Sequence, residues 1–220
     1  MLGNLTMPLQ AQVIENKPLT DEQWKQTALY QGTMVGIDVA GLAGKALGSD
    51  ATGTEASITV NLKNRFFPVA EVGYSSIDAT DDETDIHYKA SAPYFRVGMD
   101  YNVFYLKPYL PGYFTVGVRY GFSSFKYDVQ APPLTDPNWG GTTVPVSYSG
   151  VKTNAGGGEL VAGIKALVFK DFYMGFSVRY RARINMTKHE NSEPYYIPGF
   201  GKGKKTGFGV TYNFVYKLPF

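Results

Sequence analysis

The sequence predicts an all-β protein, an eight-stranded antiparallel up-and-down transmembrane β-barrel with a plugged polar lumen. Three observations support this fold class. Apolar and polar side chains alternate in about eight segments, short and long connections alternate between these segments, and aromatic residues gather at the segment ends. Successive side chains of a strand point to opposite faces, so an alternation of this kind is typical of β-strands.

The alternation is strictest in residues 112–122, GYFTVGVRYGF. One face of this segment carries bulky apolar side chains, and the other carries glycines and a single arginine, Arg119. The same period recurs in residues 30–40, 54–64, 69–75, 94–103, 158–168, 172–184 and 207–220. Segments of roughly ten residues suffice for a tilted strand to cross a bilayer, and bacterial outer-membrane barrels have an even number of strands.

The connections between these segments are sorted by length. The short ones are RFFP (65–68), FYLKPYLPG (104–112) and FKD (169–171). The long ones are residues 41–51, 76–93, 124–157 and 185–204, and they alternate with the short ones. Both termini fall on the short side. This pattern predicts short periplasmic turns and long surface loops, as in outer-membrane barrels.

The size of the barrel decides which face points outward. An eight-stranded barrel has an interior that side chains just fill, so glycines fit inside and bulky apolar groups do not. We therefore expect the apolar face to meet lipid, and the alternative is a soluble lipocalin-like barrel. Aromatic residues at the segment ends predict interfacial girdles. They are Phe66, Phe67, Phe104, Tyr105, Tyr113 and Phe172 at the turns, and Tyr74, Phe122, Phe125 and Tyr127 at the loops.

We expect two regions, an N-terminal periplasmic arm (1–28) and the transmembrane barrel (29–220). Small residues near Ala11 resemble a signal-peptidase site, but a basic n-region and a long apolar core are missing. The arm therefore includes at most the remnant of a signal peptide. Thr20 stands as an N-cap with Gln23 three residues later, which is consistent with a short helix. A solvated arm is the interpretation we favour.

Composition excludes several classes. The chain has 220 residues and a formal net charge of +2, which gives no reason to expect a nucleic-acid partner. It has no cysteine, so disulfides, thiolate metal sites and a lipoprotein anchor are excluded. A run of about 18 apolar residues, as a transmembrane helix requires, is absent.

The final segment resembles the C-terminal signal strand that the insertion machinery of outer-membrane proteins recognises. The matching residues are Tyr212, Phe214, Tyr216 and Phe220, while Pro219 departs from the pattern. Residues 29–220 resemble the small OmpA-type barrels in architecture. Residues 36–50 (GIDVAGLAGKALGSD) and 61–74 (NLKNRFFPVAEVGY) are similar to an uncharacterised family of Bacteroidota outer-membrane barrels. The resemblance implies an integral outer-membrane protein with periplasmic termini.

Charged residues on the polar face form the candidate site, a salt-bridge plug in the lumen. Burying an unpaired charge costs several kcal/mol, so we expect nearly complete pairing and a closed barrel. The plug residues are Asp38, Glu71, Arg96, Asp100, Arg119, Glu159, Lys165, Arg179, Arg181 and Arg183. One alternative is an ion path or a small-solute pore along these residues. Another is that Arg179, Arg181 and Arg183 bind lipopolysaccharide phosphate or a partner's carboxylate.

The loops offer weaker signals. Residues 199–207 (GFGKGKKTG) fail the phosphate-loop pattern and are interpreted as a basic loop near membrane phosphates. An acidic loop beside His87 is a candidate Ca²⁺ site, but its spacing matches no EF-hand, which favours a solvated loop. Its acids are Asp78, Asp81, Asp82, Glu83 and Asp85. The two histidines, His87 and His189, lie in predicted surface loops without a catalytic motif. We therefore assign no catalytic, cofactor or metal site.

Three functional hypotheses follow. The favoured one is a non-enzymatic accessory subunit of a larger outer-membrane complex, with the barrel-insertion machinery of Bacteroidota as one host. Its partners would be outer-membrane lipid, lipopolysaccharide, the insertion machinery during biogenesis, and other outer-membrane proteins or lipoproteins. The second hypothesis is a stand-alone adhesin or receptor that acts through the loop at residues 124–157. The third is a surface enzyme that uses His87 or His189.

Overall fold

The structure is a computed structural model that describes residues 17–135, 143–187 and 194–219. Two short helices accompany the strands, α1 (Asp21–Gln26) and α2 (Ala40–Ala46). The strands are β1 (Tyr30–Asp38), β2 (Ala51–Leu62), β3 (Phe66–Thr80), β4 (His87–Asn102), β5 (Gly112–Thr135), β6 (Thr143–Phe169), β7 (Phe172–Met186), β8 (Tyr196–Ile197), β9 (Gly201–Lys202) and β10 (Thr206–Lys217).

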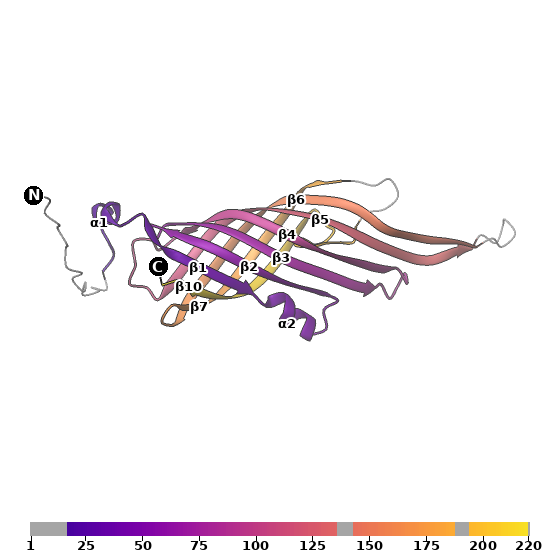
Figure 1. Cartoon of the computed structure of the whole chain (residues 1–220), viewed down its shortest axis with the longest axis horizontal. Coiled ribbons are helices and arrows are strands. Elements are labelled where there is room, and N and C mark those ends of the chain that lie inside the picture. Colours follow the sequence, from indigo (N-terminus) through magenta and orange to yellow (C-terminus); the bar gives the residue numbers. More distant parts are fainter. Residues whose placement is uncertain (1–16, 136–142, 188–193, 220) are drawn as a thin grey trace, which may run out of the picture.

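Eight of these strands form one closed antiparallel barrel (Figure 1). Neighbours in sequence pair with each other from β1 to β7, β10 pairs with β7, and β1 closes the ring against β10. The remaining strands, β8 and β9, pair only with each other. The predicted all-β fold with eight antiparallel strands is therefore confirmed. Neither of the described helices is long and apolar enough to cross a membrane.

The two ends of the barrel differ. One end, here the turn end, carries α1 and the end of β10 (Figure 1). The indole Nε1 of Trp24 in α1 donates a hydrogen bond to the carbonyl of Lys63 in the β2–β3 turn. The backbone of Leu19 donates to the carbonyl of Leu106 in the β4–β5 turn. The arm, the turns and the end of β10 thus lie together, as the sorting of the connections predicts. The opposite end is the hairpin end.

Two of the predicted long loops are largely strand, which corrects the sequence-based boundaries. β5 has 24 residues and β6 has 27, so most of residues 124–157 form a long antiparallel hairpin that projects from the barrel (Figure 1). β3 continues to Thr80 and β4 starts at His87, so most of residues 76–93 pair as well. In these stretches the apolar residues move to the opposite face of the strand. The alternation of the preceding segments is therefore interrupted, and the stretches were predicted as loops.

In the described part of the arm, residues 17–28, the structure has the short helix that was the alternative to a purely solvated arm. Residues Asp21–Gln26 form α1 with a complete capping box, in which Thr20 Oγ1 accepts from the Gln23 amide and the Gln23 side chain accepts from the Thr20 amide. These contacts satisfy backbone donors that a helix start leaves free. A second helix, α2, lies in the connection between β1 and β2, where we expected only a loop. The candidate cleavage site near Ala11 lies outside the described residues.

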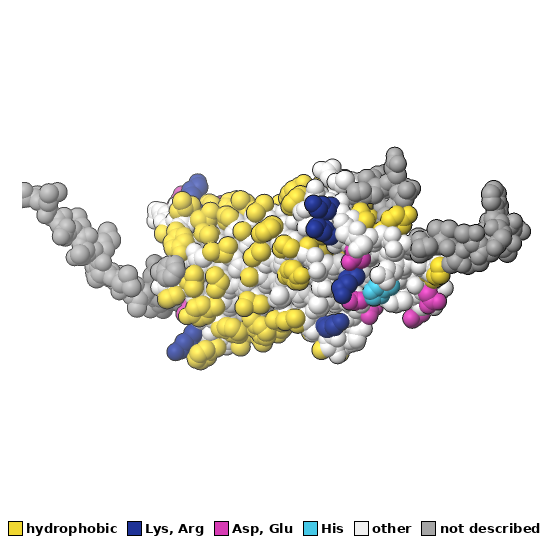
Figure 2. All heavy atoms as spheres, turned by 45° about the vertical axis from the view of Figure 1, so that its right-hand side comes forward, with side chains coloured by type: hydrophobic (Ala, Val, Ile, Leu, Met, Phe, Trp, Pro, Cys, Tyr) yellow, Lys and Arg dark blue, Asp and Glu magenta, His cyan; other side chains and the backbone are white. Residues whose placement is uncertain are grey.

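Apolar side chains cover the outside of the barrel, as predicted. Val97 of β4 is 59% exposed and Val118 of β5 is 55% exposed. We call this surface the apolar belt, and Figure 2 shows its yellow side chains spread over the turn half of the molecule. Its outward residues include Ile37, Ile58, Val72, Tyr74, Phe95, Met99, Val116, Tyr120, Phe122, Leu160, Ile164, Phe176, Val178, Tyr180, Phe208, Val210 and Tyr212. Four predicted girdle residues instead point inward: Phe67, Phe125 and Tyr127 are buried, and Tyr113 packs against Phe67 and Tyr173.

The polarity of both faces reverses along β3, β4, β5 and β6. In the belt part of β4, Arg96 is buried and Phe95 is exposed. Towards the hairpin end of the same strand, Tyr88 is buried and Lys89 is exposed. The reversal on β5 lies between Phe122, which is exposed, and Phe125, which is buried. On these strands the interior is therefore charged in the middle of the belt and apolar towards the hairpin end.

Candidate functional site

A cluster of charged side chains fills the middle of the barrel at the level of the belt. Its members come from β2 to β7, and each is at most 6% exposed. We define this ionic cluster as Glu55, Glu71, Arg96, Asp100, Arg119, Glu159 and Arg179. All but Glu55 were predicted to occupy the lumen. Such burial is tolerable only because each guanidinium lies against carboxylates.

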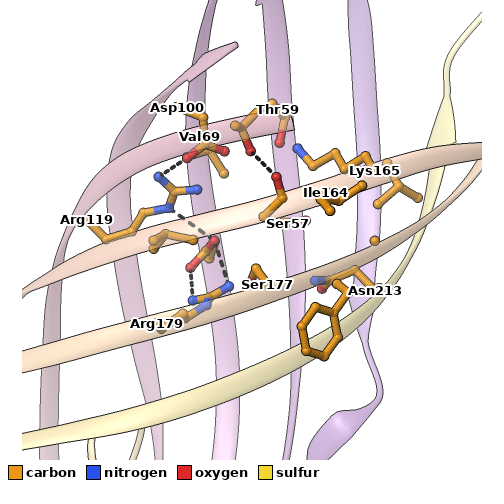
Figure 3. A pocket seen from close by; sticks show the side chains of 17 residues that line it. Ser57, Thr59, Val69, Asp100, Arg119, Ile164, Lys165, Ser177, Arg179 and Asn213 are labelled. Atoms are coloured by element: carbon orange, nitrogen blue, oxygen red, sulfur yellow. Dashed lines mark hydrogen bonds and ion pairs between the residues drawn. The ribbon is translucent and has the colours of Figure 1, made fainter. Parts of the chain in front are cut away.

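Arg179 and Glu71 lie at the centre of the ionic cluster. The Nη1 atom of Arg179 is 2.8 Å from Glu71 Oε2, and its Nη2 atom is 3.0 Å from Glu55 Oε1. Glu71 also accepts from Arg119 Nε at 3.2 Å. Figure 3 shows the Arg119 and Arg179 side chains extending from separate strands toward the same region. Arg119 in turn pairs with Asp100 at 2.7 Å.

Arg96 connects the remaining members to the hairpin end. Its Nε atom donates to Glu159 Oε1 at 2.9 Å, and its Nη1 atom pairs with Glu55. Its Nη2 atom donates to the backbone carbonyl of Gly199. The guanidinium also lies over the ring of Tyr94, 4.4 Å from the ring centre. Arg96 is therefore in contact with both the ionic cluster and the chain segment above it.

Glycines opposite the long charged side chains make this packing fit. Gly117 pairs with Asp100 across β4 and β5, and a Cβ atom there would lie 2.1 Å from Asp100 Oδ1. Gly98 pairs with Arg119, and a Cβ atom there would lie 2.7 Å from Arg119 Cδ. The expectation that inward glycines relieve crowding in a narrow barrel is thus confirmed at these positions.

Four predicted plug residues have other roles. Asp38 accepts hydrogen bonds from the backbone amides of Ala40 and Tyr212, both at 3.0 Å. Arg181 lies at the rim of the ionic cluster, with its Nε atom 3.5 Å from Glu159. Arg183 donates to the carbonyl of Gly203 at 2.8 Å. Within the described residues, Asp38 is therefore bonded to backbone amides, and Arg183 to a backbone carbonyl and to Met186 Sδ, in place of the predicted ion pairs of the plug. The fourth residue, Lys165, lines a cavity.

Lys165 lines a small cavity on the turn side of the ionic cluster (Figure 3). The cavity has a volume of about 40 Å³, which is room for a few water molecules. Within the described part of the chain, the Lys165 ammonium makes no ion pair and lies 5.9 Å from the ring centre of Phe67. The cavity is also lined by Ser57, Thr59, Asp100, Thr115, Ser177 and Asn213. Water in this polar cavity would solvate the ammonium.

An apolar cluster closes the turn side of this cavity. Phe67 and Met34 are at most 1% exposed, and they pack with Tyr173 and Val215. The ring of Phe67 also meets that of Tyr113 edge-on, with centres 5.2 Å apart. A predicted ion path along the lumen charges would have to cross this cluster and the ionic cluster in turn.

A segment of the chain enters the barrel from the hairpin end. Residues 194–203, here the inserted segment, contain β8 and β9. Ile197 is 1% exposed and packs with Phe200 in a cluster that includes Tyr88 and Tyr127. The Tyr88 hydroxyl donates to the Tyr196 carbonyl at 2.8 Å. This corrects the prediction of a surface loop for residues 194–203, and residues 188–193 of that predicted loop lie outside the described residues.

Gly199 is the residue of the inserted segment that contacts the ionic cluster, because its carbonyl oxygen accepts a hydrogen bond from Arg96. Its φ of +84° lies in the left-handed region that favours glycine. A Cβ atom there would lie 2.6 Å from Tyr94 Cγ. Gly199 and Phe200 of the predicted basic loop at residues 199–207 are therefore buried inside the barrel, while Lys202, Lys204 and Lys205 are exposed. The nearness of these lysines to membrane phosphates stays a prediction.

The acidic loop is held by its own contacts. His87 Nε2 is 3.3 Å from Asp78 Oδ1, and His87 Nδ1 is 3.0 Å from Thr80 Oγ1. Lys89 lies 3.0 Å from Asp78, and its hydrogen bond holds the pKa of that carboxyl below its ordinary value. Among the residues that the structure describes, no three His, Cys, Asp or Glu side chains are grouped to hold a metal ion. His189 and Phe220 lie outside those residues.

The fold and the interior define a class, that of closed antiparallel β-barrels filled by buried ion pairs and a segment of their own chain. The chain belongs to the family described as a domain of unknown function, DUF6048, whose model matches residues 3–220. No curated protein matches the chain. No solved structure matches it either.

Proposed function

We propose that this protein is a closed integral barrel of the bacterial outer membrane, and that it serves as a non-enzymatic accessory subunit of a larger outer-membrane complex. The turn end, with both termini, would face the periplasm, and the hairpin end would face the cell exterior. The observation that carries the proposal is the reversal of polarity along β3 to β6, combined with a filled interior.

The apolar belt approaches the height of the apolar band of an outer-membrane barrel. Outward apolar residues on β5 run from Phe114 to Phe122. These span about 26 Å along the strand and about 20 Å along the axis of a barrel with the usual strand tilt. An outer-membrane barrel carries an apolar band of about 25 Å. A soluble barrel would instead keep its apolar face inside, whereas here charged side chains fill the middle of the interior and apolar side chains surround it on the outside.

The filled interior favours a role for the outer surfaces. The ionic cluster, the turn-end apolar cluster and the inserted segment occupy successive levels of the interior. Rearranging the ionic cluster would expose charges with fixed partners, which is costly. These features support a scaffold or assembly role over transport of a solute.

The turn end offers a rigid attachment for partners. Trp24 packs edge-on against Tyr105, with ring centres 5.4 Å apart. The guanidinium of Arg65 lies 5.0 Å from the ring centre of Trp24 and 4.6 Å from that of Tyr105. This stacking fixes α1 beneath the β2–β3 and β4–β5 turns, where a periplasmic or lipoprotein partner could contact it.

A stand-alone adhesin or receptor is the second candidate. The observation that favours it is the projecting β5–β6 hairpin, which reaches far beyond the belt (Figure 1). A surface enzyme has less support. His87 contacts Asp78 and Thr80 on an exposed strand surface, where water competes for each contact.

The test is extraction of the native protein in a mild detergent, followed by sizing and mass spectrometry of the co-purifying proteins. We expect a defined complex of constant composition that persists after cross-linking in cells. A matched variant without the projecting hairpin tip (residues 131–147 replaced by a short turn) separates the candidates. An accessory subunit that docks through α1 keeps its partners in this variant, whereas an adhesin loses its ligand. Recovery of a lone 24.2 kDa barrel without cross-linked partners would contradict the accessory role.

A further inference from the structure

The barrel wall has a gap at the hairpin end of β1, which is the shortest of the eight barrel strands. The pairing of β1 with β2 ends at Asp38 and Glu55, and its pairing with β10 ends at Asp38 and Asn213. β2 extends beyond this level to Ala51 and β10 extends to Thr206, so no strand lies between them there. Helix α2 follows β1 and packs against both strands (Figure 1).

A cavity of about 190 Å³ lies at this gap. On one side it is lined by α2, β2 and β10, through residues such as Gly41, Gly53 and Val210. On the other side it is lined by Tyr196 and Gly201 of the inserted segment. Since an engineered apolar cavity of about 150 Å³ holds a benzene molecule, this cavity has room for a substituted six-membered ring.

Arg181 of β7 lines this cavity with hydrogen-bond donors that the described chain leaves unused. Its side chain is 18% exposed, and its Nε atom is buried without a hydrogen-bond partner among the described residues. Its ion pair is long, because Glu159 Oε1 lies 3.5 Å from Nε and already accepts from Arg96 Nε at 2.9 Å. A Cβ atom would lie 2.7 Å from Nη2 at Gly209 and 3.9 Å from Nη1 at Gly201. These two glycines therefore leave the terminal nitrogens open to the cavity.

The carboxylates that line the same cavity have other partners. Asp38 accepts from two backbone amides, each at 3.0 Å. Glu55 pairs with Arg96 and Arg179 in the ionic cluster. In the part of the chain that the structure describes, neither carboxylate pairs with Arg181. A bound anion would therefore displace no ion pair of these carboxylates, although their charge favours a ligand with one negative charge over a ligand with two.

The neutral groups around the cavity suit hydroxyls. The carbonyl of Tyr212 faces β1, where it accepts from the Val39 amide at 3.0 Å. Val210 lies two residues away on β10 and presents its backbone groups on the same side, where β1 has already ended. The Tyr196 hydroxyl is 2.8 Å from Ser75 Oγ at the cavity wall. A hydroxyl both donates and accepts, so it can bind a strand edge as well as another hydroxyl.

We propose that this cavity binds a small carboxylate with several hydroxyl groups, of the chemical class of the sugar acids. The Arg181 guanidinium would hold the carboxylate by two parallel hydrogen bonds, because its planar fork matches the two oxygens. The hydroxyls would bind the β10 edge and the Tyr196 side chain. The inference goes beyond the proposed function and does not rest on it, because it uses only contacts within the barrel.

The test is isothermal titration calorimetry with the full-length chain folded in dodecyl maltoside. The probes are D-glucuronate, D-glucose, acetate and inorganic phosphate. The variants are Arg181→Gln, Arg181→Lys, which keeps the charge without the fork, and Tyr196→Phe, which leaves every charge in place. The matched control is Lys202→Gln, which removes the charge of an exposed side chain beside Gly201. Thermal unfolding verifies that each variant is folded.

We expect wild-type protein and the Lys202→Gln control to bind D-glucuronate with equal affinity. Arg181→Gln should bind it about thirtyfold more weakly, Arg181→Lys about tenfold and Tyr196→Phe about threefold. D-glucose, which lacks the carboxylate, and acetate, which lacks the hydroxyls, should each bind more weakly than D-glucuronate.

Three results would overturn the proposal. Folded wild-type protein that shows no saturable binding of D-glucuronate contradicts the site as a whole. D-glucose that binds as tightly as D-glucuronate, or an equal loss in the Lys202→Gln control, contradicts the role of Arg181. Inorganic phosphate that binds more tightly than D-glucuronate contradicts the assignment to a hydroxylated carboxylate.

Discussion

The belt region and the projecting region of the same wall are built in opposite ways. Within the belt, β4 directs Arg96 and Asp100 inward and Phe95 and Val97 outward. Beyond it, β4 directs apolar side chains such as Tyr88 inward and polar side chains such as Lys89 outward. One strand thus presents apolar side chains outward in one part and polar side chains outward in the other. Under the proposed membrane location, the position of this reversal would mark the edge of the bilayer.

The two regions also differ in what stabilises them. The ionic cluster depends on charges that are favourable only while every partner is present. The interior beyond the belt is an apolar core that combines strand residues with Ile197 and Phe200 of the inserted segment. Losses in such a core scale with the volume removed and stay local when neighbours can relax. The comparison therefore predicts that a single substitution in the ionic cluster lowers the stability of the barrel more than a single substitution in the apolar interior beyond the belt.

The largest effect is expected from Glu71→Gln. This change leaves Arg119 and Arg179 without the carboxylate that both contact. Removing one partner of a buried ionic group costs about 4 kcal/mol. Equilibrium unfolding in urea, in the presence of lipid vesicles, measures the loss. Asp82→Asn on the exposed loop is the control, and a Glu71→Gln protein as stable as the control would contradict this prediction.

The belt itself can be tested with a lysine scan of outward positions on β5. Val118→Lys places a charge near the middle of the belt and is expected to cost about 3 kcal/mol. Ser124→Lys, beyond the reversal, is expected to cost nearly nothing. The free energy of unfolding from vesicles gives the profile along the strand. A flat profile would remove the main support for membrane insertion.

Ile197→Ala tests the interior beyond the belt. It deletes a side chain that is 1% exposed in the inserted segment, and we expect a loss of about 2 kcal/mol. Hydrogen exchange should rise in the inserted segment and in the neighbouring strand ends, while the ionic cluster level stays protected. Tyr195→Ala, at an exposed position, serves as the control. Exchange that rises equally at both levels would show that the two regions are not separable.

The smallest effect concerns the turn between β3 and β4. Asp81 Oδ1 accepts from the Thr84 hydroxyl and from the amides of Thr84 and Glu83, and these hydrogen bonds lower the pKa of Asp81. A depressed pKa in the folded turn means that the turn is stabilised above the ordinary aspartate pKa. That stabilisation is lost as the pH falls through the folded value. Amide shifts of Thr84 should report this transition, and Asp81→Asn should abolish it.

Much of the fold follows from the sequence because alternation encodes both strand and face. The strands, their order, the outward apolar face and six members of the ionic cluster were predicted in this way. Glu55 was not assigned to the ionic cluster, although it lies on the polar face of its segment, opposite to Ala56. Its partners Arg96 and Arg179 are on strands that do not neighbour β2, and such distances across a barrel do not follow from the pairing of adjacent segments.

The reversal of polarity explains why the outer parts of β3 to β6 were predicted as loops. Beyond the belt, side chains still alternate, but the apolar residues change parity, as from Phe122 to Phe125 on β5. A prediction that requires apolar residues to stay on one face therefore ends the strand at the reversal. The inserted segment carried a signal of its own, since Ile197, Pro198 and Phe200 form an apolar group within an otherwise polar connection. Such a group in a predicted surface loop indicates burial.

The position of the inserted segment has a consequence for biogenesis. It lies between β7 and β10, and β10 is the strand that closes the ring against β1. Residues 194–217 therefore supply both the segment that fills the hairpin end and the strand that pairs with β1, and they follow all the other barrel strands in the sequence. Arg96 can bind the Gly199 carbonyl only once that stretch has arrived. A chain in which residues 194–217 had not packed would therefore be open both between β1 and β7 and at the hairpin end.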